Sequence, residues 1–212
     1  MESQAPGSFF YCGPVAERLP TSAWTPPWGR ADRRPLVLVS FSTGPYWDQS
    51  SRILRTLEAL SGYDCRVLVT AAAADVPADL VPDNAAVVAR IPHDQVLPDV
   101  AVTITHAGHG TVMASLKHGV PLLCLPNSAA DQPILAAQAA ALGVGLALDG
   151  ELASPADIRA ATDRLLTDPS YARNARRLAR EIAAAPGVAA MVSRLEQLPR
   201  AEDARADSAA KA

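Results

Sequence analysis

The 212-residue sequence has few cysteines, no excess of positive charge and no long hydrophobic run. Cys12, Cys65 and Cys124 lie far apart, and the last two stand in apolar, strand-like runs, so we interpret them as buried free thiols rather than as a disulfide or a zinc site. The net charge is −3, and the arginines are scattered rather than gathered on the basic face that a nucleic-acid backbone requires. The sequence therefore argues against a DNA- or RNA-binding protein.

No segment reads as a signal peptide or a transmembrane helix. Met1 leads into the polar stretch ESQAPGS, and no apolar run approaches the ~20 residues that cross a bilayer. We therefore expect a soluble, cytoplasmic protein. The length allows one good hydrophobic core and leaves little room for a large two-domain enzyme.

The two ends of the chain lack a hydrophobic period. Residues 1–35 are rich in proline and carry Trp24 and Trp28, a composition that is typical of an extended interdomain connector. Residues 199–212 have no apolar stripe, and we expect a disordered tail there.

Between these ends, short apolar runs alternate with amphipathic ones. The apolar runs predict strands at residues 36–41, 65–70, 85–91, 100–105, 121–126 and 144–148. The amphipathic runs predict helices at residues 50–60, 111–119, 134–142, 154–166, 168–185 and 186–198, and the helix after Ser154 opens on a Ser-Pro start signal. Because strands that are apolar throughout are buried on both faces, we expect an α/β fold with a Rossmann-like, doubly wound parallel sheet.

Polar residues follow four of the predicted strands. They are Ser42, Thr43 and Gly44; Arg90, Ile91, Pro92 and His93; His106 to Thr111; and Asn127, Ser128, Asp131 and Gln132. In a doubly wound sheet, ligands bind beyond the carboxyl ends of the strands. The four loops converge on one edge of the sheet, and we expect the functional site there.

The turn after residues 100–105 reads HAGHGT. Gly108 and Gly110 let the backbone approach a ligand, and Thr111 begins a helix whose free amides favour an anion, so the turn suits a phosphate. Paired glycines at such a turn also serve tight packing, and this alternative stays open. The spacing differs from the GxGxxG dinucleotide fingerprint and from the GKS/T phosphate loop, so neither NAD nor ATP is favoured.

The histidines of this stretch suggest a metal site at first sight, because His106 and His109 are three residues apart. No third ligand stands at a suitable spacing, and a hydrogen bond from His106 to an anionic oxygen makes fewer demands. We therefore predict no metal. His118 precedes Gly119, where a cation would cap the free carbonyls of a helix end.

The stretch THAGHGTVMASLKHGVPLLCLP, Thr105 to Pro126, is followed by SAADQP. It resembles the donor-binding region of nucleotide-sugar-dependent glycosyltransferases of the macrolide and UDP-glucosyl/glucuronosyl type, which have the GT-B fold. The resemblance starts at FFYCGP and runs through PPW and RPLVLVSFST to about residue 198. It implies that residues 36–198 form the C-terminal, donor-binding domain of such an enzyme, with the N-terminal, acceptor-binding half absent from this sequence.

The resemblance also implies residue roles. Its diphosphate contacts fall on His106, Gly108, His109, Gly110, Thr111, Ser42 and Thr43. Its base contacts fall on Arg90, Ile91 and His93, and its sugar-hydroxyl contacts fall on Asp131 and Gln132. Asp131 and Gln132, with Pro133, also suit the start of a helix, and the two roles can coexist.

Two positions depart from the family pattern. Arg90 stands where many relatives have Trp, although a guanidinium can still stack on a base. Ala114 stands where they have a Glu that binds the ribose hydroxyls. Loss of that carboxylate favours a dTDP-sugar over a UDP-sugar as the donor.

The resemblance implies inverting, metal-independent transfer of a sugar from a dTDP- or UDP-sugar to a hydroxyl of a small natural-product acceptor, with no cofactor beyond the donor itself. It places the general base, a His, in the N-terminal half, so the chain alone is expected to bind donor and transfer nothing. Two alternatives remain. One is a catalytically inert nucleotide-binding partner or activator of a full-length glycosyltransferase. The other is a sugar-nucleotide epimerase of the same fold, whose catalytic carboxylates have no clear place in this sequence.

Overall fold

The computed structural model describes residues 10–14, 25–29, 31–41, 49–72, 74–128 and 131–197. The chain divides into two compact units: Arg18–Arg180, and Met1–Glu17 together with Glu181–Ala212. The predicted boundaries at residues 35 and 198 stay predictions, and the predicted tail at 199–212 lies outside the described residues. No helix in the described part of the chain is long and apolar enough to cross a membrane.

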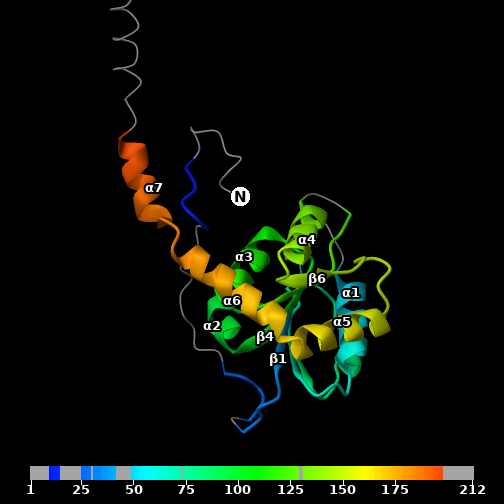
Figure 1. The fold of residues 1–212 in the computed structure, drawn as a ribbon. Helices are drawn as coiled ribbons and strands as arrows, with labels where there is room; N and C mark the ends of the chain where they lie inside the picture. The colour runs from blue at the N-terminus through cyan, green and yellow to red at the C-terminus, as the bar shows by residue number, and fades with distance from the viewer. Residues whose placement is uncertain are drawn as a thin grey trace, which may run out of the picture. The chain divides into compact units, whose positions relative to one another are not determined.

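The larger unit is built around one six-stranded parallel sheet (Figure 1). Its strands are β1 (Leu36–Ser40), β2 (Arg66–Thr70), β3 (Ala85–Val88), β4 (Val100–Thr105), β5 (Leu122–Cys124) and β6 (Gly145–Ala147). Their spatial order is β3-β2-β1-β4-β5-β6. This is the doubly wound Rossmann order, so the predicted fold class and all six predicted strands are confirmed.

Helices connect successive strands of the sheet, and α5 follows the last strand. They are α1 (Ser50–Leu60), η2 (Ala78–Leu80), α2 (His93–Val96), η3 (Leu97–Asp99), α3 (His109–Lys117), α4 (Gln132–Ala141) and α5 (Pro155–Thr167). α6 (Pro169–Ala183) follows α5 and crosses the boundary between the units, and α7 (Gly187–Glu196) lies in the smaller unit. All the longer helices agree with the predicted ranges within a few residues.

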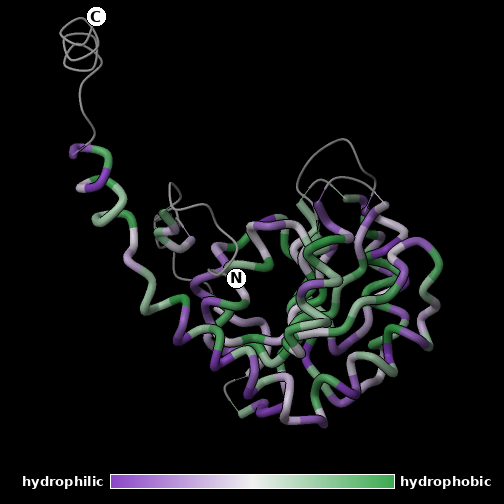
Figure 2. The backbone as a smooth tube through the Cα atoms, turned by 45° about the horizontal axis from the view of Figure 1, so that its top comes forward, coloured by the Kyte–Doolittle hydropathy of each residue, from purple (hydrophilic) through white to green (hydrophobic). Residues whose placement is uncertain are grey.

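Alternate residues of the strands face two apolar cores, one on each side of the sheet. On one side Val37 and Val39 pack with Ile53 of α1 and Ile158 of α5. On the other side Leu36 and Leu38 pack with residues of α2, η3 and α3. Figure 1 shows α1 and α5 on one side of the sheet and α2 and α3 on the other. In Figure 2 the hydrophobic colour gathers in the interior of this unit, where the strands lie.

Local sequence signals account for several element ends. Ser154 caps α5, because its hydroxyl accepts from the Asp157 backbone N–H while the Asp157 carboxylate accepts from the Ser154 backbone N–H, which is a complete capping box. All three cysteines are free, and Cys65 and Cys124 are buried as predicted, whereas Cys12 is only partly buried. Trp28, in the described part of the predicted connector, packs against the core that contains Leu36, and its ring centre lies 5.8 Å from the Arg66 Cζ.

The strand register brings the carboxyl ends of the strands to one edge of the sheet. Ser40, the last residue of β1, is paired with Thr70 of β2 on one side and with Thr105 of β4 on the other. The strand order reverses between β1 and β4, because β2 and β3 lie on one side of β1 and β4 to β6 lie on the other. Ligands of doubly wound proteins bind at this switch point.

Candidate functional site

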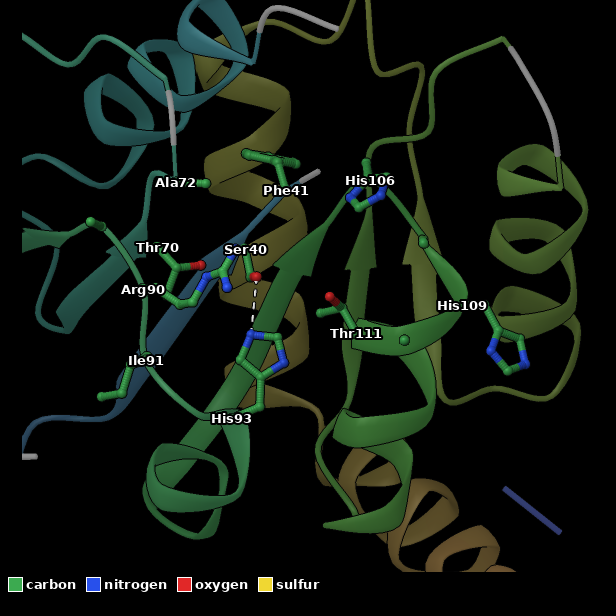
Figure 3. A pocket seen from close by; sticks show the side chains of 13 residues that line it. Ser40, Phe41, Thr70, Ala72, Arg90, Ile91, His93, His106, His109 and Thr111 are labelled. Atoms are coloured by element: carbon green, nitrogen blue, oxygen red, sulfur yellow. Dashed lines mark hydrogen bonds between the residues drawn. The ribbon is translucent and has the colours of Figure 1, made fainter. Parts of the chain in front are cut away.

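A pocket of about 260 Å³ opens at the switch point, beyond the ends of β1, β2 and β4 (Figure 3). It is lined by Ser40, Phe41, Thr70, Ala72, Ala89, Arg90, Ile91, His93, His106, Gly108, His109, Gly110 and Thr111. Eight residues predicted from the sequence are among these: the three assigned to the base and five of the seven assigned to the diphosphate. The structure thus brings the predicted base loop and the predicted phosphate turn to one pocket.

The remaining predicted site residues are placed differently. Ser42 and Thr43 lie outside the described residues. Asp131 and Gln132 begin α4 and are not among the residues that line the pocket. Asp131 is exposed, whereas Gln132 is buried with its Oε1 accepting from the Asn127 backbone N–H at 2.9 Å. Their contact with a sugar stays a prediction.

Sequence reasoning missed Ser40, Phe41, Thr70, Ala72 and Ala89 as pocket residues. Ser40 ends the apolar run of β1, and Thr70 ends the apolar run that follows Arg66 in β2. That polar ending is the signal that could have identified them, because ligands of doubly wound sheets bind beyond the carboxyl ends of the strands.

The imidazole of His106 lies over Gly108 at the top of β4. A Cβ on Gly108 would stand 2.7 Å from His106 Cε1 and still closer to Nε2, so a larger residue there would collide with the ring. Ala107 between them has φ 63°, in the left-handed region that non-glycine residues rarely adopt. Such strained positions occur most often at functional sites.

His106 is neutral at physiological pH. Its side chain is 8% exposed, and burial lowers its pKa to about 4, with a further contribution from the positive charge of Arg52 against an opposing one from Asp131. Nδ1 is buried and has no hydrogen-bond partner among the described residues. A neutral imidazole carries one N–H donor and one acceptor, so His106 can give a single hydrogen bond to a ligand oxygen.

The start of α3 presents free backbone amides to the same pocket. Gly108 is the N-cap, no side chain caps the helix, and no acidic residue stands in the first turn. The first N–H groups of a helix have no intrahelical acceptor and carry the positive end of the helix dipole. Figure 3 shows the Thr111 side chain turned toward the pocket, while the exposed His109 ring points away, so His109 offers its amide rather than its imidazole.

The base loop after β3 supplies the other end of the pocket. Ile91 is buried and Arg90 is exposed. The His93 Nε2 lies 3.2 Å from the Ser40 hydroxyl, as Figure 3 shows, and burial lowers the pKa of His93. The Ser40 contact therefore fixes a neutral imidazole at the pocket floor.

His118 does not cap α3 with its side chain. Its Nε2 lies 2.9 Å from the Asp94 Oδ1 of α2, so the ring bridges two helices instead of binding the helix carbonyls. Lys117 approaches the same carboxylate at 3.6 Å. This cluster joins the base loop to the phosphate helix from outside the pocket.

The part of the chain that the structure describes contains no group of three or more His, Cys, Asp or Glu side chains placed to hold a metal ion. His106 and His109 do not form a pair there, because the first ring is buried and the second is exposed and turned away.

Residues 54–198 match the family described as the C-terminal domain of erythromycin biosynthesis protein CIII-like proteins. The chain belongs to this family. It is also similar to erythronolide mycarosyltransferase of Saccharopolyspora erythraea, 31% identical over 191 residues that cover 88% of this chain and 45% of the relative. UDP-glycosyltransferase 2 of Phaeomoniella chlamydospora is 29% identical over 212 residues, which cover 94% of this chain and 46% of the relative.

Members of this group of glycosyltransferases have also been solved. The calicheamicin glycosyltransferase CalG4 is 27% identical, with a TM-score of 0.73 over 82% of this chain and 45% of that one. The glycosyltransferase VinC, solved in complex with dTDP, is 26% identical, with a TM-score of 0.69 over 83% of this chain and 44% of that one. The chain spans about half the length of the relatives that it matches. It is the C-terminal domain of the natural-product glycosyltransferase family, and its sheet is that of the GT-B fold.

Proposed function

We propose that this domain binds the nucleoside diphosphate of a sugar donor in an inverting, metal-independent glycosyltransferase. The observation that carries the proposal is the convergence of the base loop, the His106 turn and the start of α3 on one pocket at the switch point. A nucleoside diphosphate needs an apolar slot for its base and N–H donors for its phosphates, and the two must lie no farther apart than the base and the phosphates of one ligand. The pocket offers both.

The base would lie against Ile91 and under the exposed Arg90, whose planar guanidinium can stack on a ring. Ala114 in α3 packs with the core on this side of the sheet and offers no carboxylate to a ribose. A deoxyribose needs no such partner. We therefore infer a dTDP-sugar rather than a UDP-sugar, and the dTDP in the solved complex of the similar VinC supports this choice.

The diphosphate would bind at the N-terminus of α3, with the neutral His106 as an additional donor. Negative charge accumulates on the leaving diphosphate when the acceptor hydroxyl displaces it from the anomeric carbon with inversion. Fixed amides and an imidazole N–H that are already oriented stabilise this charge without reorganising, which is the type of electrostatic help that lowers a barrier most. Asp131 and Gln132 would hold the sugar hydroxyls, and the proton of the acceptor would pass to a base in an N-terminal half.

An inert nucleotide-binding partner of a complete glycosyltransferase is the second candidate. Such a partner has no use for sugar-binding groups, and Asp131 and Gln132 at the start of α4 therefore favour the donor domain of an enzyme.

Calorimetric titration with dTDP, UDP and thymidine tests the proposal. We expect dTDP to bind, and His106→Ala to weaken dTDP by about tenfold, since a hydrogen bond to a charged group contributes about 1.5 kcal/mol or more. Thymidine, which lacks the diphosphate, is the matched control and should be almost unaffected. If neither dTDP nor UDP binds at millimolar concentration, the donor-site proposal is wrong, and equal losses for dTDP and thymidine would refute the phosphate role of His106.

A further inference from the structure

A buried arginine lies behind the wall of the pocket. Arg52 stands in the first turn of α1, and its side chain is 6% exposed. Its guanidinium donates to the Gln49 Oε1 at 3.0 Å, to the Asn127 Oδ1 at 2.6 Å and to the Gly150 carbonyl at 3.1 Å. We refer to Gln49, Arg52 and Asn127 as the Arg52 cluster.

The positive charge of this cluster is balanced only by a long ion pair with an exposed carboxylate. The three acceptors of Arg52 are neutral, and its nearest carboxylate, Glu151, is 3.7 Å away with a side chain that is 68% exposed. Burial lowers the pKa of Arg52, and the nearby carboxylates of Glu151 and Asp149 oppose this shift. A buried cation whose nearest carboxylate is exposed costs folding free energy, so its presence calls for a compensating role.

The cluster also contains amide donors without acceptors. Gln49 Nε2 and Asn127 Nδ2 are buried and make no hydrogen bond with the described residues, and the same holds for His106 Nδ1. All three side chains are more than nine-tenths buried. Buried polar groups in folded proteins are almost always paired. The unpaired N–H groups of Gln49 and Asn127 beside a cation add to the positive potential on this side of the pocket.

The cluster is adjacent to the predicted phosphate turn. The Arg52 guanidinium stands 5.7 Å from the centre of the Phe41 ring, and Phe41 lines the pocket together with His106. The charge of Arg52 also reaches His106, whose protonation it disfavours. Phe41, labelled with His106 in Figure 3, thus contacts the Arg52 guanidinium and also lines the pocket.

We propose that Arg52 is a positioning residue of the donor site, whose buried charge, held by Gln49 and Asn127, stabilises the bound diphosphate from behind the wall formed by Phe41 and His106. This inference rests on the proposed function and adds to it a residue that does not touch the ligand. Arg52 acts through its electric field, which is strong because the intervening region is buried. It also fixes the loop at Asn127, whose backbone N–H binds Gln132.

Arg55 provides a matched control on the same helix. Its guanidinium donates to the carbonyls of Gly150, Glu151 and Ala153, so it ties α1 to the same segment that Arg52 contacts. It makes no contact with Asn127 or Phe41 among the interactions described. Loss of Arg55 should therefore reproduce the loss of the tie between α1 and residues 150–153, without the contact at Asn127 and without the electrostatic part.

The test compares Arg52→Met and Arg55→Met by calorimetry with dTDP and thymidine on the complete chain. We expect Arg52→Met to weaken dTDP by about tenfold or more and thymidine by less than about threefold, because only dTDP carries the charge that the cation stabilises. Arg55→Met should leave the ratio of the two affinities unchanged. In a titration followed by NMR, Arg52→Met should also raise the pKa of His106 above its value of about 4.

Equal effects of Arg52→Met on dTDP and thymidine, with no change in the His106 titration, would overturn the inference and leave Arg52 a structural tie. If Arg52→Met does not fold, Arg52→Lys decides instead, because it retains the charge and loses the fork of hydrogen bonds. It should keep the dTDP-to-thymidine ratio within about threefold of wild type, and a tenfold fall would contradict the electrostatic role. If the wild-type protein binds neither dTDP nor UDP, the proposed function itself is wrong. If the wild type binds dTDP and Arg52→Met binds it equally tightly, only this inference is refuted.

Discussion

At the residue scale, the His106 ring leaves no room for a side chain at position 108. Gly108 has φ −65° and ψ 137°, which any residue adopts, so the glycine is not required by its backbone conformation. It is required by space, since a Cβ would reach the His106 ring. We therefore expect Gly108→Ala to displace the imidazole and to weaken dTDP binding about as much as His106→Ala does, roughly tenfold.

A double-mutant cycle measured by calorimetry checks this expectation. If Gly108 acts by making room for His106, Gly108→Ala should weaken dTDP no further in a His106→Ala background, because the ring that it displaces is gone. Additive losses would show that Gly108 has a separate role, such as close approach of the ligand to its backbone.

Most of the residues that line the pocket could be predicted from the sequence, whereas the buried residue that lies behind them could not. His106 and Gly108 stand out because they interrupt an apolar pattern at a strand end. Arg52 does not stand out, because an arginine in the first turn of an amphipathic helix reads as a solvated residue. Its burial depends on Asn127 and Gly150, which are more than 70 positions away, and no local pattern reports such a contact.

At the scale of elements, the short helix α2 and the phosphate helix α3 are joined by the Asp94–His118 contact of 2.9 Å. The hydrogen bond from His118 lowers the pKa of Asp94. A carboxyl whose pKa is lower in the folded state than in the unfolded state stabilises the fold above its unfolded pKa and loses that contribution as the pH falls through the folded value. The stabilisation should therefore be complete at pH 7 and vanish in acid.

We expect Asp94→Asn to lower the free energy of unfolding by less than about 1 kcal/mol at pH 7, since the Asp94 side chain is 55% exposed. The difference from wild type should shrink as the pH falls below about 4. Urea unfolding at pH 7, 5 and 3 measures it, with Asp99→Asn, an exposed aspartate in η3, as the control. A difference that grows in acid would contradict the assignment.

Most elements could be predicted because their periods are clear. The strands are short, mostly apolar runs, and α1 and α5 carry apolar residues on one face, so a doubly wound parallel sheet could be predicted. The order β3-β2-β1-β4-β5-β6 could not, because doubly wound sheets have more than one common strand order. The four-residue helix α2 and the short turns η2 and η3 could not be predicted, because three or four residues are too few to show a period. His93 belongs to one of them, which is why its contact with Ser40 was not foreseen.

At the scale of the whole molecule, the two units differ in how they bury apolar residues. Every buried hydrophobic residue of the described chain lies between Leu36 and Ala175. In the smaller unit, α7 buries none of its residues and exposes Val188, Val192 and Leu195 at 42%, 44% and 58%. We expect the acceptor-binding half of a complete glycosyltransferase to cover this exposed apolar surface.

This distribution of buried residues predicts that a fragment of residues 18–180 folds and binds dTDP by itself. The fragment retains both apolar cores and every residue that lines the pocket. It should unfold in urea in one cooperative transition and bind dTDP with an affinity within about threefold of that of the complete chain, because it keeps the surface whose burial drives folding.

A fragment of residues 18–150 is the matched control. It lacks α5, and with it Ile158 and Leu165 of the core beside α1, and removal of two buried side chains of this size costs several kcal/mol, about as much as a domain's whole stability. If the longer fragment unfolds without a cooperative transition, the smaller unit contributes to the core in a way that its exposed helix does not suggest.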